Sequence, residues 1–219
     1  MAQRVTIPAN QGELSGMLEL PSGDARSPAI VVIHEYWGVN EQIQSIAAAW
    51  AATGFVALVP DLYHGKVAKD AAEAGGLMKA LDFTKAVQEI GAAVAYLRSH
   101  PRSTGKVCVT GYCLGGALTL ASAVNLRGIA AAIPFYGLPG ELEWTKVDAP
   151  IQAHFARSDD WATVEGAQKI KDAVTVPMEL HVYEAQHAFC NDRRPEVYNA
   201  EAATLAWTRA VSFARTHTA

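Results

Sequence analysis

The segment Gly111-Tyr112-Cys113-Leu114-Gly115 holds the side chain best suited to covalent chemistry, a cysteine with a glycine two positions away on either side. A β-rich run precedes it and a helical run follows, as in the nucleophile elbow G-x-S-x-G, with Cys in place of Ser. The glycines let strand and helix approach closely around a strained turn. The start of the helix favours a thiolate at Cys113, and the backbone N–H of Leu114 can stabilise an oxyanion. The alternative is a small buried cysteine in a glycine-rich turn.

A cysteine nucleophile requires a general base, and in chains of this pattern an acid and then a histidine follow the nucleophile. Four histidines lie downstream of the cysteine. His154 and His181 fall inside predicted strands, and His217 falls in a C-terminal tail that we expect to fray. His187 comes after the predicted strand Met178–Val182, at the carboxyl end of a parallel strand, where catalytic groups gather. We therefore predict that His187 is the base.

The acid that orients this base is expected in the loop after the strand Ile151–Phe155, which contains Asp159 and Asp160. The spacing from the end of the strand favours Asp159, and one of the two can instead cap the next helix. Glu35 follows another buried strand, where a carboxylate is rarely present for packing, although a surface loop acid is the alternative. The next residue, Tyr36, offers a second backbone N–H to an oxyanion.

The remaining reactive side chains have simpler interpretations. Cys108 lies in the middle of a predicted strand and is expected to be an inert buried thiol. Cys190, three residues after His187, is either a packed loop residue or a second reactive thiol. Asp61 follows a strand and is expected to tether loops by hydrogen bonds. No group of His, Cys, Asp and Glu has metal-ligand spacing and no glycine-rich phosphate loop follows a strand, so we expect neither a metal nor a cofactor.

The elements that position these residues alternate along the chain, as in a mostly parallel sheet with helices on both faces. The expected strands lie near Val5–Pro8, Leu14–Leu20, Ala29–His34, Phe55–Val59, Lys106–Thr110, Ile129–Phe135, Ile151–Phe155 and Met178–Val182. The first two are separated by a turn signal, Asn10-Gln11-Gly12. The expected helices cover about Glu41–Thr53, Leu77–Ser99, Leu114–Val124, 161–174 and Asn199–Thr216, and residues 61–76 are expected to be irregular. No linker divides the chain, so residues 1–219 are predicted to form one domain.

Composition excludes several classes of function. The 219 residues are 50% hydrophobic and 18% charged, which is typical of a globular protein. The formal net charge is −4, so nothing favours binding to nucleic acid or an anionic membrane. The pattern of the first residues leads us to expect no secretory signal, and the most apolar stretch, Ile46–Pro60, is too short to span a bilayer. An odd count of three cysteines favours a reducing compartment, so we expect a cytoplasmic protein, and we expect it to be a monomer.

Several of these motifs together resemble the dienelactone hydrolase (carboxymethylenebutenolidase) family of α/β hydrolases over nearly the whole chain. The matching segments are His34-Glu35-Tyr36-Trp37-Gly38-Val39-Asn40, Pro60-Asp61-Leu62-Tyr63, Gly111-Tyr112-Cys113-Leu114-Gly115-Gly116, the loop at Asp159, and Tyr183-Glu184-Ala185-Gln186-His187-Ala188-Phe189. The resemblance implies an α/β-hydrolase fold without a large cap domain, and a Cys113–His187–Asp159 triad acting on small esters or lactones. It also implies that Glu35 pairs with the Cys113 thiol and takes up its proton when substrate arrives.

In and next to these motifs we expect four residues to bind the substrate: Trp37, Tyr63, Phe189 and Asn191. The best-known members of the family hold a substrate carboxylate with two arginines, but residues 64–82 contain no arginine and the position after the histidine is Asn191. Only Arg193 and Arg194 could replace them, and if both are exposed to solvent, neutral esters should be good substrates. The alternative to a cofactor-free hydrolase is a non-hydrolytic thiol protein, either a redox sensor using Cys113 with Cys190 or a degenerate member of the fold that only binds.

Overall fold

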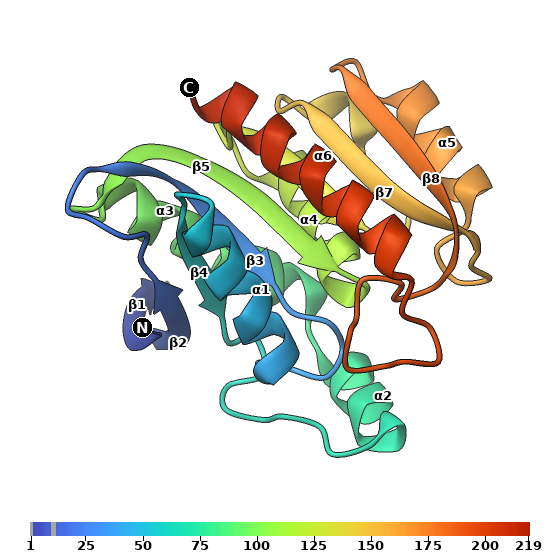
Figure 1. The fold of residues 1–219 in the computed structure, drawn as a ribbon, viewed down its shortest axis with the longest axis horizontal. Helices are drawn as coiled ribbons and strands as arrows, with labels where there is room; N and C mark the ends of the chain where they lie inside the picture. Colours follow the sequence, from blue (N-terminus) through green and yellow to red (C-terminus); the bar gives the residue numbers. More distant parts are fainter. Residues whose placement is uncertain (1, 10–11) are drawn as a thin grey trace.

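An eight-stranded sheet runs through the computed structural model, which describes residues 2–9 and 12–219 (Figure 1). The strand order is β1-β2-β4-β3-β5-β6-β7-β8. β1 pairs antiparallel with β2, and β2 pairs antiparallel with β4, whereas the other neighbouring strands are parallel. The bounds are β1 Gln3–Ala9, β2 Gly12–Glu19, β3 Ser27–Ile33, β4 Val56–Pro60, β5 Ser103–Tyr112, β6 Ala131–Phe135, β7 Ile151–Ser158 and β8 Met178–Gln186.

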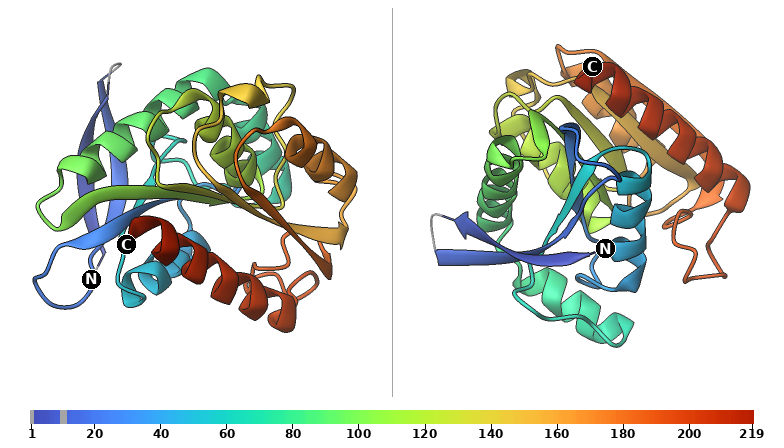
Figure 2. Two further views of the ribbon diagram at one scale, coloured as in Figure 1. Left: turned by 90° about the horizontal axis from the view of Figure 1, so that it is seen from above. Right: turned by 60° about the vertical axis from the view of Figure 1, so that its left-hand side comes forward.

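Helices cover both faces of this sheet (Figure 2). One face carries α1 and α6, and the other carries α3, α4 and α5, each packed into its own apolar layer. Their bounds are α1 Glu41–Ala52, α2 Ala71–Ala80, α3 Phe83–Ser99, α4 Leu114–Asn125, α5 Val164–Ala173 and α6 Ala200–Thr218, with a short 3-10 helix at Trp144–Lys146. The predicted architecture, a mostly parallel sheet between two helical layers, is confirmed.

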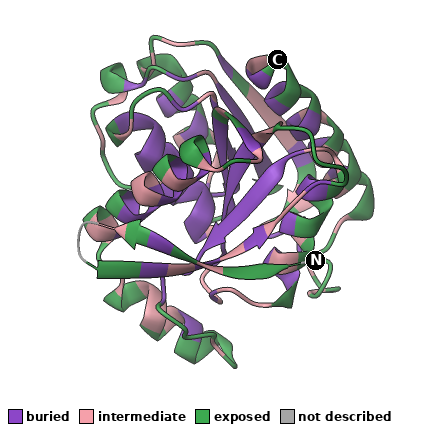
Figure 3. Ribbon diagram, turned by 90° about the vertical axis from the view of Figure 1, so that its left-hand side faces the viewer, coloured by how far each residue is buried: buried purple, intermediate pink, exposed green. Residues whose placement is uncertain are grey.

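The sequence of β3 shows why the central strands are buried on both sides. Ile30 and Val32 pack in the layer of α1 and α6, while Val31 and Ile33 pack in the layer of α3 and α4. All four side chains are fully buried, so a strand in this position must be apolar at every residue rather than at alternate ones. Figure 3 shows this buried centre between exposed helix surfaces.

The segment after β4 differs from the expectation. Residues 71–76 are helical, not irregular, and the helix expected over Leu77–Ser99 is two helices that break at Leu81 and Asp82. Side-chain caps explain both differences, because Asp70 accepts a hydrogen bond from the Glu73 N–H and Asp82 accepts one from the Lys85 N–H. Each cap fixes a helix start that apolar periodicity alone does not reveal.

Three further boundaries also shift. β8 continues to Gln186, so the predicted loop at 183–186 is strand, and α5 begins at Val164 because the Thr163 hydroxyl caps it. α6 continues to Thr218, so His217 lies in its last turn and not in a frayed tail. Of the predicted turn Asn10-Gln11-Gly12, the first two residues lie outside the described part of the chain.

Two negative findings concern the described residues, 2–9 and 12–219. None of their helices is long and apolar enough to cross a membrane. The insertion between β4 and α3 is the short α2, and these residues contain no larger cap over the carboxyl edge of the sheet.

A pair of glycine substitutions tests the packing of the sheet against α4. A Cβ on Gly115 would collide with the backbone carbonyl of Ile33, so Gly115→Ala should lower the free energy of unfolding by about 2–4 kcal/mol. Gly76→Ala is the control, because Gly76 lies in a helix with open space around it, and it should be neutral or stabilising by up to about 1 kcal/mol. Urea unfolding measures both, and equal stabilities of the two variants would contradict the close contact.

Candidate active site

Five parallel strands end at one edge of the sheet, and each delivers one polar or reactive side chain there. Glu35 follows β3, Cys113 follows β5, Tyr136 follows β6, Asp159 follows β7 and His187 follows β8. The carboxyl ends of parallel strands lie side by side, so residues separated by up to 152 positions in sequence meet in one place.

Cys113 occupies a strained turn between β5 and α4. Its φ is 56°, a left-handed value that residues with a side chain rarely adopt, and it directly precedes the first residue of α4. The turn is held because the Cys113 N–H donates to the Phe135 carbonyl and its own carbonyl accepts from the Ala117 N–H. The surrounding backbone therefore fixes the thiol at the helix N-terminus, where the helix dipole favours a negative charge.

Cys113, His187 and Asp159 form a continuous chain of hydrogen bonds. His187 Nε2 lies 3.1 Å from Cys113 Sγ, and His187 Nδ1 lies 2.7 Å from Asp159 Oδ2. Burial alone would lower the pKa of His187, but the hydrogen bonds to Asp159 and Cys113 outweigh burial and raise it to about 10. A protonated imidazole beside the sulfur stabilises a thiolate.

The Asp159 carboxylate is held in place by more than the histidine. Its Oδ1 accepts hydrogen bonds from the backbone N–H groups of Trp161 and Ala162, both at 2.9 Å. Burial would raise the pKa of Asp159, but the bonds from His187 and from the two N–H groups keep it below its usual range. The carboxylate therefore stays ionised and fixes the orientation of the imidazole.

Glu35 is a buried carboxyl group with two hydrogen-bond donors. Asn191 Nδ2 donates to its Oε2 at 2.7 Å, and the Tyr136 hydroxyl donates to its Oε1 at 3.3 Å. Burial raises the pKa of Glu35 in spite of these donors and of the nearby His187. Among the described residues, the Cys113 sulfur has its hydrogen bond with His187 and not with Glu35, so the pairing implied by the family resemblance is not formed here.

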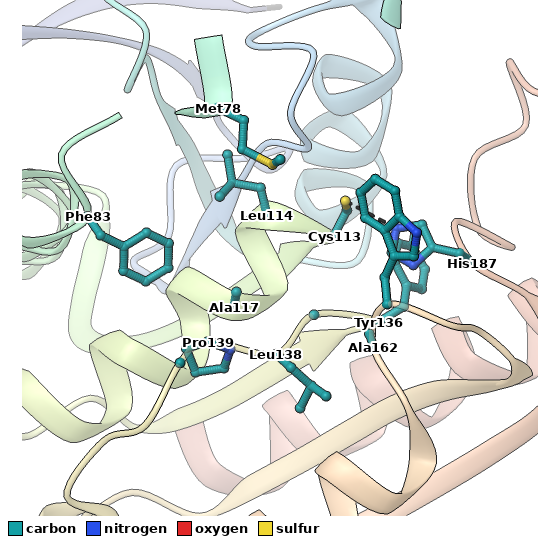
Figure 4. A pocket seen from close by; sticks show the side chains of 13 residues that line it. Met78, Phe83, Cys113, Leu114, Ala117, Tyr136, Leu138, Pro139, Ala162 and His187 are labelled. Carbon is teal, nitrogen blue, oxygen red and sulfur yellow. Dashed lines mark hydrogen bonds between the residues drawn. The ribbon is translucent and has the colours of Figure 1, made fainter. Parts of the chain in front are cut away.

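Two cavities meet at the nucleophile, and both are lined by Cys113, His187 and Trp161. The first, of about 350 Å³, is called the apolar cavity (Figure 4); its other lining residues are Met78, Phe83, Leu114, Ala117, Tyr136, Gly137, Leu138, Pro139, Gly140 and Ala162. The second, of about 290 Å³, is called the polar cavity; its other lining residues are Glu35, Tyr36, Ser158, Asp159, Asp160, Gln186, Ala188, Arg194 and Val197. The sulfur thus lies at a boundary between two different environments.

The four residues expected to bind substrate line neither of these cavities. Phe189 is fully buried against the ring of Tyr136. Asn191 is also buried, and its side-chain amide donates a hydrogen bond to Glu35. Tyr63 is buried against His34, and Trp37 packs edge-on against Tyr36. These residues are close in sequence to the reactive groups, but their side chains do not line the site.

In contrast, both residues expected to supply oxyanion donors line a cavity. Tyr36 lines the polar cavity and Leu114 lines the apolar one.

Two residues at the site, Tyr136 and Trp161, were not anticipated, and Arg194 was expected there only as one of two alternatives. Tyr136 directly follows β6, which is the same signal that identified the other strand-end residues. Trp161 is 73% exposed and lies two residues after Asp159, in the stretch expected to be helical. Arg194 lines the polar cavity while Arg193 is exposed, so the interpretation in which both arginines face solvent is wrong for Arg194. Its guanidinium is held by Glu196 at 2.8 Å, which places a cation beside the site.

Burial and hydrogen bonding define the environments of Cys108, Cys190 and Asp61. Cys108 is fully buried, and burial raises its pKa to about 12, as expected for an inert thiol. Burial also raises the pKa of Cys190 well above its usual value. Asp61 accepts hydrogen bonds from the Ser15 hydroxyl and the Gly65 N–H, so it ties its own turn to strand β2, whereas a tether between loops was expected. Within residues 2–9 and 12–219, no cluster of three His, Cys, Asp or Glu side chains could hold a metal ion.

Comparison with known proteins yields a family match over most of the chain. The model of the dienelactone hydrolase family matches residues 14–218. Protein usf of Aquifex pyrophilus is 34% identical over 97% of both chains. A carboxymethylenebutenolidase of a Pseudomonas species is also 34% identical, over 90% of this chain and 88% of its own.

Solved structures agree on the fold. A dienelactone hydrolase-like promiscuous phosphotriesterase from metagenomic libraries superposes with a TM-score of 0.92, at 22% identity, over 100% of this chain and 99% of its own. At this identity the likeness concerns the fold, and it confirms the predicted α/β-hydrolase architecture.

The contact between His187 and Cys113 predicts which thiol reacts first. With limiting iodoacetamide at pH 7, Cys113 should be alkylated before Cys108 and Cys190, whose pKa values are raised by burial. His187→Ala should slow alkylation of Cys113 roughly tenfold, because the imidazolium no longer stabilises the thiolate. Peptide mapping by mass spectrometry measures the order, with His217→Ala as the histidine control. First labelling at Cys108 or Cys190 would contradict the assignment.

The raised pKa of Glu35 predicts how stability depends on pH. A carboxyl group whose pKa is higher in the folded protein than the usual 4.5 contributes stability below pH 4.5 that is lost as the pH rises. Glu35→Gln removes this loss and can keep both hydrogen-bond partners. The variant should therefore be more stable than the wild type at pH 7 and equally stable near pH 4. Urea unfolding of both proteins at several pH values measures the difference in stability. A difference that does not change with pH would refute the raised pKa of Glu35.

Proposed function

The chain belongs to the dienelactone hydrolase family of hydrolases, and we propose that residues 1–219 act as one domain that hydrolyses small esters or lactones through an acyl-enzyme on Cys113. The observation that carries the proposal is the hydrogen-bonded chain from Cys113 through His187 to Asp159, at a nucleophile that two cavities reach. Such an arrangement activates a thiol and leaves room for groups on both sides of the reacting carbonyl.

In the first half of the reaction, the Cys113 thiolate attacks the ester carbonyl carbon. The carbonyl oxygen takes up the negative charge, and the backbone N–H groups of Tyr36 and Leu114 are the proposed donors to it. The intermediate collapses when the C–O bond breaks, and the His187 imidazolium gives its proton to the departing alkoxide. An acyl thioester on Cys113 and a free alcohol result; in a lactone, the alcohol remains attached to the acyl group.

In the second half, His187 acts as a general base. Its neutral imidazole takes a proton from water, and the hydroxide attacks the thioester carbonyl. The C–S bond then breaks, which releases the carboxylic acid and restores the thiolate–imidazolium pair. Asp159 stabilises the imidazolium in both halves because its carboxylate stays ionised.

Glu35 is proposed to act on the same thiol as a second acid–base group. Its raised pKa suits a carboxyl group that takes up a proton more readily than an ordinary glutamate. Its fixed contacts to Tyr136 and Asn191 mean that the thiol must rotate toward it, away from His187. Glu35→Gln is therefore expected to be more stable but less active, as is common for a functional group that is buried at a cost in stability.

A non-hydrolytic thiol protein is the less favoured alternative. A protein that only bound ligands would not require the base and its orienting acid to be aligned on the thiol at 3.1 Å and 2.7 Å. A redox pair of Cys113 and Cys190 would form a disulfide under mild oxidant, which mass spectrometry would detect.

Turnover of 4-nitrophenyl acetate tests the proposal. Cys113→Ala should abolish turnover, and His187→Ala should lower kcat by roughly 10³-fold or more, because triad members act as a unit. His217→Ala, in the last turn of α6, is a control at a histidine away from the site and should keep wild-type activity. Unchanged turnover in Cys113→Ala would rule out the covalent mechanism.

A further inference from the structure

We infer that the apolar cavity binds an aliphatic or aromatic group of the substrate, attached directly to the ester that Cys113 attacks. The preferred substrates are then neutral esters with a medium-sized apolar group on one side of the scissile bond. This inference rests on the proposed hydrolase function and specifies the substrate class for it.

The chemistry of the lining supports this assignment. Apart from Cys113, His187 and the phenol of Tyr136, the described residues that line the apolar cavity are apolar side chains and glycines. Two aspartates, a glutamate and an arginine line the polar cavity instead. A charged group placed in the apolar cavity would lose its hydration without gaining a partner, whereas an apolar group would gain by leaving water.

The position of the cavity ties it to catalysis. Figure 4 shows Met78, Phe83 and Leu114 on one side of Cys113 and His187 on the other. A group that fills this space therefore lies next to the sulfur and the base, within one substituent of the reacting carbonyl. At about 350 Å³ the cavity is within the size range of small-molecule sites and larger than a methyl group requires.

The part of the apolar cavity wall that Met78 and Phe83 form depends on the break between α2 and α3. α2 ends at Ala80 and α3 begins at Phe83, with Asp82 as the cap of α3. A single continuous helix would project residues 78 and 83 on different faces, about 140° apart, at 100° per residue. The break lets both side chains face the same cavity, so this local feature of the sequence shapes the substrate site.

Rates for two series of simple esters test the inference. One series has a methanol leaving group with acetate, butanoate, hexanoate or octanoate as the acyl group. The other has an acetyl group with methanol, butanol or hexanol as the leaving alcohol. Proton release measures kcat/KM, and in one series it should rise about two- to fourfold per methylene until the cavity is full. The series that rises identifies which side of the ester enters the cavity.

Two wall variants assign the effect to this cavity. Leu138→Ala and Met78→Ala should each reduce the octanoate-to-acetate ratio, or the hexanol-to-methanol ratio, by about fivefold or more, since the chain loses apolar contacts. Leu138 is in the loop after β6, whereas Met78 is on α2. Local disruption of one segment therefore cannot explain a reduced ratio in both variants. Leu205→Ala, at an exposed position on α6, is the control and should keep the wild-type ratios. Urea unfolding checks that each variant is folded.

The outcomes separate this inference from the proposed function. Flat rates across both series, with activity still lost in Cys113→Ala, would overturn the apolar subsite and leave the hydrolase mechanism intact. A ratio that falls in Val197→Ala, in the polar cavity, and not in Leu138→Ala or Met78→Ala would also overturn it. If the wild type hydrolyses neither series nor 4-nitrophenyl acetate, the proposed function itself fails.

Discussion

The close packing of backbone against backbone beneath Cys113 is the constraint on which the site depends. A Cβ on Gly115 would meet the Ile33 carbonyl, and one on Gly137 would meet the carbonyl of Cys113 itself. β3, β5, β6 and α4 can therefore approach only where these side chains are absent. Their contact holds Cys113 at a φ of 56° and brings the strand ends together around its sulfur.

The placing of two buried carboxyl groups is the second feature that shapes the protein, and ionisation of one of them, Glu35, opposes stability. Glu35 lines the polar cavity in an environment that disfavours its ionised form, whereas Asp159 receives enough hydrogen bonds to remain ionised. Two carboxyl groups at the ends of β3 and β7 thus have pKa values displaced in opposite directions. Such a separation allows Asp159 to stay a fixed negative charge while Glu35 takes up a proton more readily.

The sequence revealed the parts of the site that depend on local order along the chain. Cys113, Asp159 and His187 were predictable because each follows a recognisable strand, and their distances agree with the expected arrangement. The contact between Asn191 and Glu35 joins residues 156 positions apart, and spacing carries no information about such a pair. The break between α2 and α3 was missed because apolar periodicity continues across it, whereas the cap at Asp82 decides where the helix starts.

Trp161 has a consequence outside catalysis, because its indole ring is 73% exposed, while Trp50 is fully buried in the layer of α1 and α6. The ring of Trp161 lies 6.1 Å from that of His187, measured between centroids, and lines both cavities. A protonated imidazole at this distance quenches indole fluorescence, and a bound ligand displaces the water around the ring. The protein therefore carries an intrinsic optical probe of the candidate active site, through which ligand entry and the charge on His187 can be followed by emission spectroscopy without any label.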